Sequence, residues 1–253
     1  MKKLITFSLL TLVLGTSAMP TTSPAASESS PTVLITGANR GLGLEFARQY
    51  EEAGWQVIGT ARKPDAATDL KNLGVTVMQL DVTDGDSVAQ LAKDLDGRPI
   101  DMLINNAGIL PSQNTLTETE VDTVAWILDV NTLGPLRVTQ ALLPNLGAGD
   151  RKTIINITSG LGSIAQNQSG RFYGYRESKA ALNMFSRTLA AELGGDGFIV
   201  VAMDPGWVQT DMGGPNATLT PEQSISGIRS VIDSLTVEDT GTYRRYNGAT
   251  VPW

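Results

Sequence analysis

Two residues in the C-terminal half of the chain have the types and the spacing of a proton-transfer pair. Tyr175 and Lys179 lie four positions apart in the stretch YGYRESK, whereas Tyr173 is followed at that spacing by Glu177. Residues four apart on a helix share one face, so the lysine ammonium can lie beside the tyrosine phenol. A free tyrosine has a pKa of about 10, and a neighbouring cation is expected to lower it toward neutral pH. The alternative is an ordinary pair on a helix surface.

The residue types that the chain lacks narrow the chemistry. Its 253 residues include no cysteine and no histidine. This excludes disulfides, thiolate nucleophiles, zinc sites with cysteine ligands and a Ser-His-Asp triad, and we expect no metal site. Acid–base work must fall to tyrosine, lysine or carboxyl groups. The formal charge of −7 argues against non-specific nucleic-acid binding.

The first thirty residues differ in composition from the rest. Residues 1–18 combine a basic start, an apolar stretch and small residues before Ala18, the pattern of a cleaved secretory signal. The apolar stretch is too short for a comfortable membrane span. Residues 19–31 are rich in Ser, Thr, Pro and Ala, which predicts a disordered spacer. We therefore expect export, with a mis-assigned start and a cytoplasmic location as the alternative.

From residue 32 onward, short β-branched runs alternate with helical stretches, as repeated βα units require. Continuous apolar strands are typical of a parallel sheet covered by helices on both faces. We expect one α/β domain over residues 32–253, with a doubly wound, Rossmann-type sheet of about seven strands. Strands are expected at 32–36, 55–60, 75–80, 100–105, 153–157, 198–203 and in the tail after residue 240, and helices at 42–54, 65–73, 84–95, 117–145, 172–193 and 221–235.

A glycine-rich turn, TGANRGLG, joins the first expected strand to the first expected helix. Gly37, Gly41 and Gly43 let the backbone approach a pyrophosphate at the positive end of the helix dipole. A tight turn would also use glycine for its own reasons. The place of this turn in the first βα unit favours a dinucleotide. Asn39 and Leu42 lie in the same turn and are also predicted to contact the cofactor.

The end of the second expected strand differs from the pattern of NAD-binding folds. Where those folds place an acidic residue for the ribose diol, this chain reads GTARK, with Arg62 and Lys63. Arg40 stands inside the glycine turn. Two guanidinium groups suit a 2′-phosphate, because arginine binds phosphate in a bidentate way. We therefore expect NADP(H) rather than NAD(H); the alternative is a pair of solvated surface arginines.

Seven motifs, in order, resemble the short-chain dehydrogenase/reductase family across residues 32–253. They are TGANRGLG, LDVTD, NNAG, VNTLG, ITSG, YRESK and DPGWVQTDM. The stretches SGLGSI, YGYRESKAALNM, PGWVQTDMGG and NGATVPW extend the resemblance to carbonyl reductases of the sniffer and C-factor type. The resemblance implies a catalytic tetrad of Asn131, Ser159, Tyr175 and Lys179.

The resemblance also implies a role for each member of this tetrad. Tyr175 would donate a proton to a carbonyl oxygen as hydride reaches the carbon, and Ser159 would hydrogen-bond that oxygen. Lys179 would also bind the nicotinamide ribose, and Asn131 would hold a water that relays protons to Lys179. The further cofactor contacts that the resemblance implies are Asp81, Val82, Asn105, Ala107, Gly108, Pro205, Gly206, Val208 and Thr210.

One departure from the family is that Ser159 and Tyr175 are separated by 16 positions, which is more than usual. The intervening residues must form a longer loop beside the substrate. Residues 160–171, Trp207 and residues 212–220 would line the substrate mouth. Thr158 and Ser163 flank the predicted serine, and the resemblance favours Ser159 over both.

The sequence thus predicts an NADPH-dependent reductase of small aldehydes or ketones. Two alternatives remain. The chain could be an exported signalling or binding protein that retains the fold and the cofactor site, or an alcohol dehydrogenase that works oxidatively with the same residues. Family members often form dimers or tetramers through the helix that carries the tyrosine, so the resemblance implies a homodimer or a homotetramer.

Overall fold

A computed structural model describes residues 1, 4, 30–111 and 113–253 of the chain. Nearly all of the expected secretory signal and of the expected spacer lies outside these residues. Among the residues described, no helix is long and apolar enough to cross a bilayer.

Seven parallel strands form one sheet in the order β3-β2-β1-β4-β5-β6-β7. The order reverses between β1 and β4, and ligands of doubly wound folds bind at the carboxyl ends of the strands beside such a reversal. The expected fold class is confirmed, and all seven strands lie close to their expected positions. The strands are β1 Thr32–Ile35, β2 Gln56–Ala61, β3 Thr76–Gln79, β4 Met102–Asn105, β5 Thr153–Ile157, β6 Ile199–Asp204 and β7 Thr242–Arg245.

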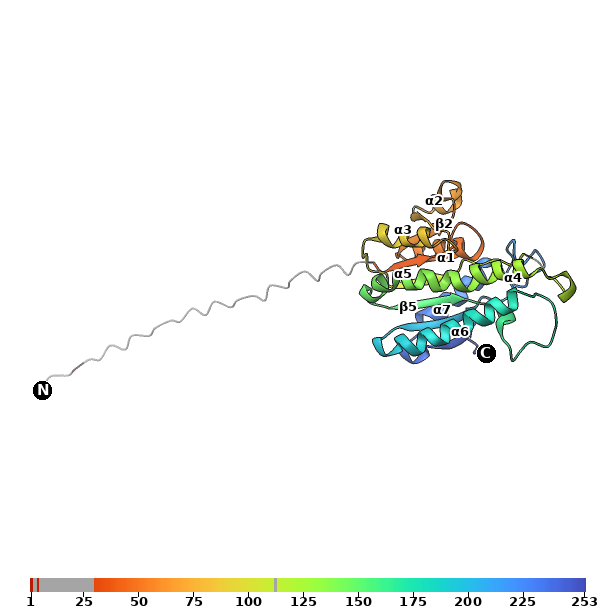
Figure 1. Cartoon of the computed structure of the whole chain (residues 1–253). Coiled ribbons are helices and arrows are strands. Elements are labelled where there is room, and N and C mark those ends of the chain that lie inside the picture. The colour runs from red at the N-terminus through yellow and green to blue at the C-terminus, as the bar shows by residue number, and fades with distance from the viewer. Residues whose placement is uncertain (2–3, 5–29, 112) are drawn as a thin grey trace.

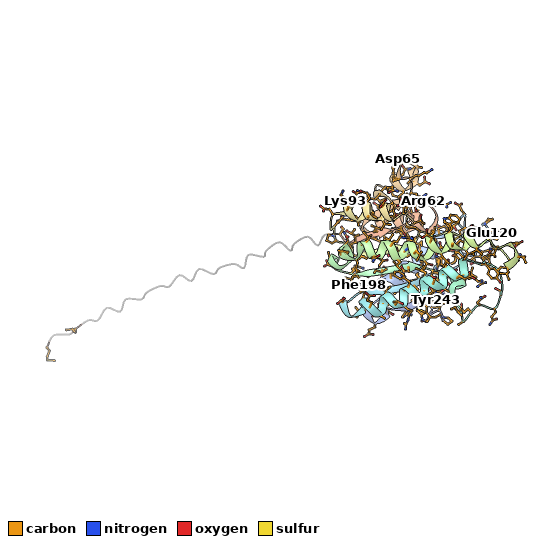
Figure 2. The ribbon with its side chains drawn as sticks, viewed as in Figure 1. Arg62, Asp65, Lys93, Glu120, Phe198 and Tyr243 are labelled. Atoms are coloured by element: carbon orange, nitrogen blue, oxygen red, sulfur yellow. The ribbon has the colours of Figure 1, made fainter. Side chains whose placement is uncertain are left out.

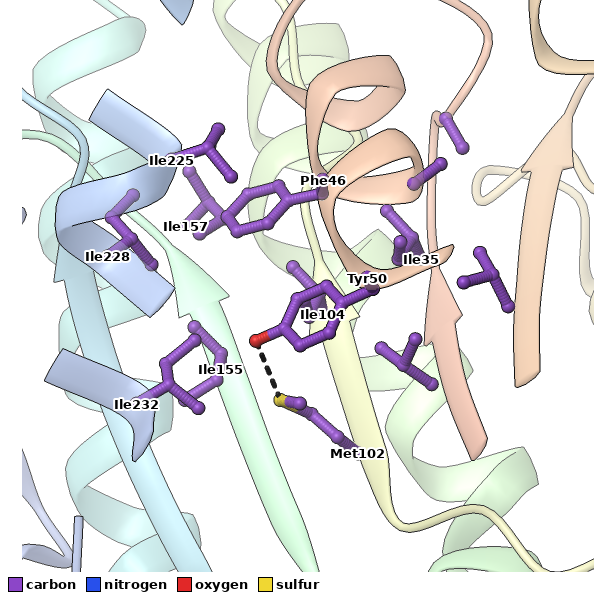
Figure 3. Close-up of a cluster of buried hydrophobic side chains, with 14 of the residues drawn as sticks. Ile35, Phe46, Tyr50, Met102, Ile104, Ile155, Ile157, Ile225, Ile228 and Ile232 are labelled. Atoms are coloured by element: carbon purple, nitrogen blue, oxygen red, sulfur yellow. Dashed lines mark hydrogen bonds between the residues drawn. The ribbon is translucent and has the colours of Figure 1, made fainter. Parts of the chain in front are cut away.

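Helices cover both faces of this sheet (Figure 1). Helices α1, α2 and α7 pack on one face through a core cluster that includes Phe46, Tyr50 and Ile228. In Figure 3 the Tyr50 hydroxyl reaches the sulfur of Met102, 3.8 Å away. Helices α3, α5 and α6 bury a second cluster against the other face. The helices are α1 Gly41–Glu52, α2 Thr68–Asn72, α3 Gly85–Leu95, α4 Val121–Leu128, α5 Gly134–Ala148, α6 Tyr175–Leu193 and α7 Pro221–Asp233.

Three expected helices differ in extent from the structure. The helix expected over 172–193 begins only at Tyr175, because Arg171 and Phe172 have φ of +74° and +62°, which a right-handed helix excludes. The helix expected over 65–73 is a short turn, Pro64–Ala66, followed by α2. The region expected over 117–145 is interrupted. Its parts are a turn at Leu116–Glu118, then α4, a π-helical turn at Asp129–Leu133, and α5.

Three more short turns connect the elements in the C-terminal half: Gly160–Gly162 after β5, Gly194–Asp196 after α6, and Val237–Asp239 before β7. The first of these follows the predicted catalytic serine directly, so it sets the direction in which the chain leaves β5.

Candidate active site

Tyr175 and Lys179 lie at the N-terminal end of α6 and are both buried. Tyr175 is the first residue of the helix, and Gly174 before it has φ +82°. The two side chains retain only 6% and 4% of their exposure, and the lysine Nζ lies 5.7 Å from the centre of the tyrosine ring. Nζ also donates a hydrogen bond of 2.9 Å to the carbonyl of Ile157 at the end of β5. The alternative interpretation, an ordinary pair on a helix surface, is therefore wrong.

Burial favours the neutral form of both groups and shifts the pKa of each accordingly. It lowers the pKa of Lys179 to about 8. It raises the pKa of Tyr175 to about 12; the Ser159 hydroxyl opposes this rise by hydrogen bonding, and the charge of Asp204 adds to it. The expectation of a lowered pKa for Tyr175 is therefore wrong for this arrangement, because desolvation of the phenolate is the largest cause and raises the pKa. The phenol is protonated at neutral pH and able to donate.

Ser159 lies two residues after the end of β5 and caps the turn Gly160–Gly162. Its Oγ accepts a hydrogen bond from the N–H of Leu161 at 3.2 Å. Its carbonyl accepts one from the hydroxyl of Tyr243 at 2.5 Å. These two contacts fix the backbone of Ser159, and its hydroxyl still has a proton to give to a ligand.

The two hydroxyls that flank Ser159 in the sequence have structural partners. Thr158 donates to Oδ1 of Asn183 at 2.7 Å, inside the protein. Ser163 donates to the carbonyl of Pro252 at 2.6 Å and so ties the loop to the C-terminus. This engagement supports the choice of Ser159 as the hydroxyl that faces a substrate.

Asn131 lies in the π-helical turn between α4 and α5 and is fully buried. Its Oδ1 accepts from the N–H of Ile109 at 2.8 Å, and its Nδ2 donates to the carbonyl of Ile109 and to Oγ of Ser178. A Cβ on Gly108 would lie 3.4 Å from Asn131 Oδ1 and 3.6 Å from Lys179 Nζ, so the two side chains converge there. Oδ1 keeps one lone pair that is able to accept a hydrogen bond from a water.

The glycine turn after β1 has the close backbone packing that a cofactor cradle requires. Gly37 and Gly41 have φ of +65° and +54°. A Cβ on Gly37 would lie 3.0 Å from the Cα of Ala107, and a Cβ on Gly43 only 2.2 Å from the carbonyl oxygen of Gly37. Gly41 faces Thr210, which places the turn opposite the loop after β6. The packing of this turn thus leaves no room for a side chain at Gly37 or Gly43.

Two residues that the sequence reasoning missed hold this turn in place. Asn106 donates from Nδ2 to the carbonyls of Thr36 and Gly37, at 2.9 and 3.1 Å. The Oγ1 of Thr36 accepts from the N–H groups of Asn106 and Ala107, both at 3.0 Å. Asn106 lies in the motif NNAG and Thr36 in TGANRGLG, so these motifs could have identified both residues from the sequence.

The side chain of Asn105, a residue that the resemblance places among the cofactor contacts, points into the core. Its Nδ2 donates to Thr139 and to Asn156, at 3.1 and 2.9 Å, and the residue is 2% exposed. The side chain therefore joins β4 to β5 and α5 inside the core. Only the backbone of Asn105 remains for a cofactor.

The two arginines predicted to bind one phosphate have different surroundings. The guanidinium of Arg40 pairs with Asp211 at 2.8 Å, and both side chains are largely exposed. Arg62 has no ion pair among the residues described, and its charge reaches Asp81. The pKa of Asp81 lies below its usual range, because hydrogen bonds from Thr83 and the charge of Arg62 outweigh the effect of burial. Arg62 lies well away from Tyr243, which is on the edge strand β7 (Figure 2).

The remaining predicted cofactor contacts are divided between surface and core. Asn39 is exposed on the glycine turn, and Leu42 packs partly against the first core cluster. Val82 and Val208 are buried, at 8% and 4% exposure, so neither offers much side-chain surface to a ligand. Pro205 is buried as well, and Gly206 after it turns with φ +76°.

The long loop between Ser159 and Tyr175 borders an open pocket of about 290 Å³ against the start of α6. Tyr173 and Arg176 line it, together with residues of the expected substrate mouth, whereas no member of the predicted tetrad does. Trp207 is 53% exposed, and its ring N–H donates to the carbonyl of Gly213 at 2.8 Å. This hydrogen bond holds a large apolar surface in one orientation after β6.

Comparison with known proteins agrees with this geometry. Residues 31–219 match the family model for short chain dehydrogenases. The C-signal protein of Myxococcus xanthus is 46% identical over 155 residues, which cover 61% of this chain and 93% of that protein.

Two solved structures are similar over nearly their whole length. The carbonyl reductase Sniffer of D. melanogaster has a TM-score of 0.84 and 31% identity, covering 89% of this chain and 100% of that one. An NADPH-bound carbonyl reductase from chicken fatty liver has a TM-score of 0.83 and 34% identity, covering 88% and 99%.

Proposed function

Because the chain belongs to the short-chain dehydrogenase family, we propose that it reduces an aldehyde or ketone to an alcohol with NADPH, with Tyr175 as the proton donor. The observation that carries this proposal is the buried pair of Tyr175 and Lys179 at the carboxyl end of β5. A phenol whose pKa is about 12 is in the acid form at neutral pH, which is the form that carbonyl reduction needs.

The described residues fit a dinucleotide. Gly37, Gly41 and Gly43 form a cradle with no room for a side chain at Gly37 or Gly43, and they open into the N-terminus of α1. Arg62 offers a cation at the end of β2, where these folds hold the adenosine ribose. NADPH, when bound, would supply the hydride.

The chain's own residues account for orientation and for the proton. Ser159 donates its hydroxyl proton as a hydrogen bond to the substrate oxygen, and Tyr175 transfers its proton to that oxygen. Lys179, held on the carbonyl of Ile157, lies beside the ring and stabilises the phenolate that forms. Asn131 keeps the chain at Ile109 and Gly108 next to Lys179, so that a water on its Oδ1 can return a proton.

The test follows NADPH oxidation by the purified protein with a panel of aldehydes and ketones. Tyr175→Phe removes the donor hydroxyl and is expected to lower kcat by about 10³-fold while NADPH binding is retained. Tyr173→Phe is the matched control, because it removes a hydroxyl two positions away that lines the loop pocket instead. A Tyr175→Phe enzyme as active as the Tyr173→Phe enzyme would refute the mechanism.

The preference for NADPH is tested separately. Arg62→Asp is expected to weaken NADPH binding about tenfold or more relative to NADH, since a carboxylate repels the 2′-phosphate and accepts from a ribose diol. Lys93→Asp, on α3, changes the net charge by the same amount and serves as control. Equal NADPH-to-NADH ratios in the two variants would remove Arg62 from the phosphate site.

A second candidate function is that of an exported signal or binding protein. Similarity to a protein named C-signal supports it, as does the signal-like pattern of residues 1–18. N-terminal sequencing of protein recovered from each cell fraction tests export and cleavage after residue 18. If export is found, a phenotype that is the same with wild type and with Tyr175→Phe would favour recognition over catalysis.

Working oxidatively, as an alcohol dehydrogenase, is less well supported. Oxidation needs the phenolate, and the raised pKa of Tyr175 opposes that form at neutral pH.

For the assembly, we propose a homodimer or homotetramer, which light scattering tests. Exposed apolar side chains on α4 to α6, such as Trp126, Leu133 and Met184, support it.

A further inference from the structure

A partly buried ion pair joins the last residues of β6 and β7. Asp204 and Arg245 are paired in the register of the two strands, and Arg245 Nε lies 3.0 Å from Asp204 Oδ2. The side chain of Asp204 is only 5% exposed, so this carboxylate depends on its protein partners for compensation. Neither residue belongs to the tetrad or to the cofactor contacts discussed above.

This pair contacts two segments of the chain, one before and one after the catalytic tyrosine in the sequence. Asp204 Oδ1 accepts a hydrogen bond of 3.0 Å from the N–H of Gly206, in the turn where the nicotinamide end of a dinucleotide is expected. On the other side, a Cβ on Gly160 would lie 3.2 Å from Asp204 Oδ2 and 3.6 Å from Arg245 Nη2. The backbone that follows Ser159 therefore rests directly on the ion pair.

The same strand, β7, makes a second contact with the serine. Tyr243 lies two residues before Arg245, so both side chains leave the same face of the strand. The Tyr243 hydroxyl donates to the carbonyl of Ser159 at 2.5 Å. The edge strand β7 thus contacts Ser159 through Tyr243 and lies beside the next residue, Gly160, through Arg245.

We propose that Asp204 and Arg245 are a positioning pair for the catalytic centre: through Gly160 and Gly206, they hold the Ser159 turn and the turn after β6 in register with each other. This inference rests on the proposed function and adds two residues that act through others.

The pair also sets the charge around the phenol. The charged or titratable groups that face Tyr175 are Lys179 on α6, Asp204 on β6 and Tyr243 on β7, and Arg245 balances Asp204. Burial is the main cause that raises the pKa of Tyr175, and the charge of Asp204 adds to this rise. Removing this carboxylate while Arg245 remains has the opposite effect, because it leaves an unbalanced cation near the ring.

The test compares Asp204→Asn with Asp239→Asn in the full-length protein. Asp239 pairs with Arg244 at 2.7 Å, one residue from Arg245 on the same strand, and it has no contact with the tetrad. We expect Asp204→Asn to lower kcat at least fivefold and to move the alkaline limb of the kcat profile down by about one pH unit. Asp239→Asn is expected to change neither. Wild-type kcat and an unmoved limb in a folded Asp204→Asn enzyme would overturn the proposal.

Gly160→Ala covers the case in which Asp204→Asn does not fold. The new methyl presses on the Asp204 carboxylate but leaves both charges in place. A kcat at least threefold below wild type, with NADPH affinity retained, supports the positioning role, and a wild-type kcat refutes it.

Failure of the proposed function can be told apart from failure of this inference. If the wild type oxidises no NADPH with any carbonyl, the tyrosinate absorbance of Asp204→Asn is titrated, with the matching Tyr175→Phe variant subtracted. A pKa of Tyr175 below that of the wild type supports the electrostatic link without any activity, and an unchanged pKa refutes it.

Discussion

The two halves of the site are built in opposite ways. Around the glycine turn, the surface that would meet a cofactor is backbone, and polar side chains such as Thr36 and Asn106 only brace it. Around Tyr175, the working groups are side chains that are buried and charged or titratable, among them Lys179 and Asp204. The first half presents backbone because its glycines carry no side chain. In the second half, burial shifts the pKa values of the side chains.

The largest effect should come from the charge in the second half. Lys179→Met keeps the length of the side chain but removes the ammonium that stabilises the phenolate and holds the carbonyl of Ile157. We expect kcat/KM for carbonyl reduction to fall about 10³-fold. Lys152→Met is the control, since Lys152 also donates to a backbone carbonyl, that of Asp196, but lies outside the site. Similar activity in the two variants would mean that the buried cation has no catalytic part.

A smaller loss is expected from adding one methyl to the first half. Gly43→Ala would place a Cβ 2.2 Å from the carbonyl oxygen of Gly37, so the turn must shift. We expect NADPH affinity, measured by fluorescence titration, to fall about 10- to 100-fold, because overpacking costs about 1–3 kcal/mol.

Gly147→Ala supplies the control for this substitution. Gly147 lies in α5 with no atom within 4 Å of an added Cβ. This change should leave NADPH binding intact and raise stability by about 0.5 kcal/mol, because alanine is the better helix former. If Gly43→Ala bound NADPH as well as Gly147→Ala does, the turn would not be a cradle.

These halves also differ in how much the sequence reveals. The glycine turn and the Tyr175–Lys179 pair are short-range patterns, and burial and convergence of the pair agree with its four-residue spacing. Asn105 was assigned from the resemblance to the family, which does not show that its side chain faces the core while that of the next residue, Asn106, faces the turn.

Contacts between distant segments could not be read from the sequence. Arg40 meets Asp211 across 171 positions, and Arg245 meets Asp204 across 41. The pKa of Tyr175 was predicted in the wrong direction for the same reason, since the effect of burial depends on the whole fold. The four-residue spacing reveals the cation, but it does not reveal the loss of water around the phenol.

The buried lysine should leave a signature in the pH dependence of stability. Its pKa is 10.5 when exposed and about 8 in the fold. Below pH 8 the lysine is charged in both states, and the fold bears the full cost of burying the cation. Between the two values the unfolded chain binds the extra proton, so stability rises with pH. Relative to Lys179→Met, the wild type should gain about 3 kcal/mol of unfolding free energy across this window.

Urea unfolding of both proteins at several pH values measures this difference. Taking the difference removes the other groups that titrate at alkaline pH, including the buried tyrosines, because both proteins share them. A difference that stays flat from pH 7 to 11 would mean that water reaches Lys179 in the folded protein, and the contrast between the two halves would weaken accordingly.

The smallest effect is expected where the first half does carry charged side chains. Arg40 and Asp211 are 70% and 81% exposed, so their ion pair should add little to stability. Asp211→Asn removes an anion from the rim of the cradle and frees Arg40 for a phosphate. We expect an unchanged melting temperature and a two- to fivefold gain in NADPH affinity at low salt, which shrinks as salt screens the charges. Weaker binding would show instead that the ion pair helps to shape the cradle, and the cofactor half would then depend on side chains much as the catalytic half does.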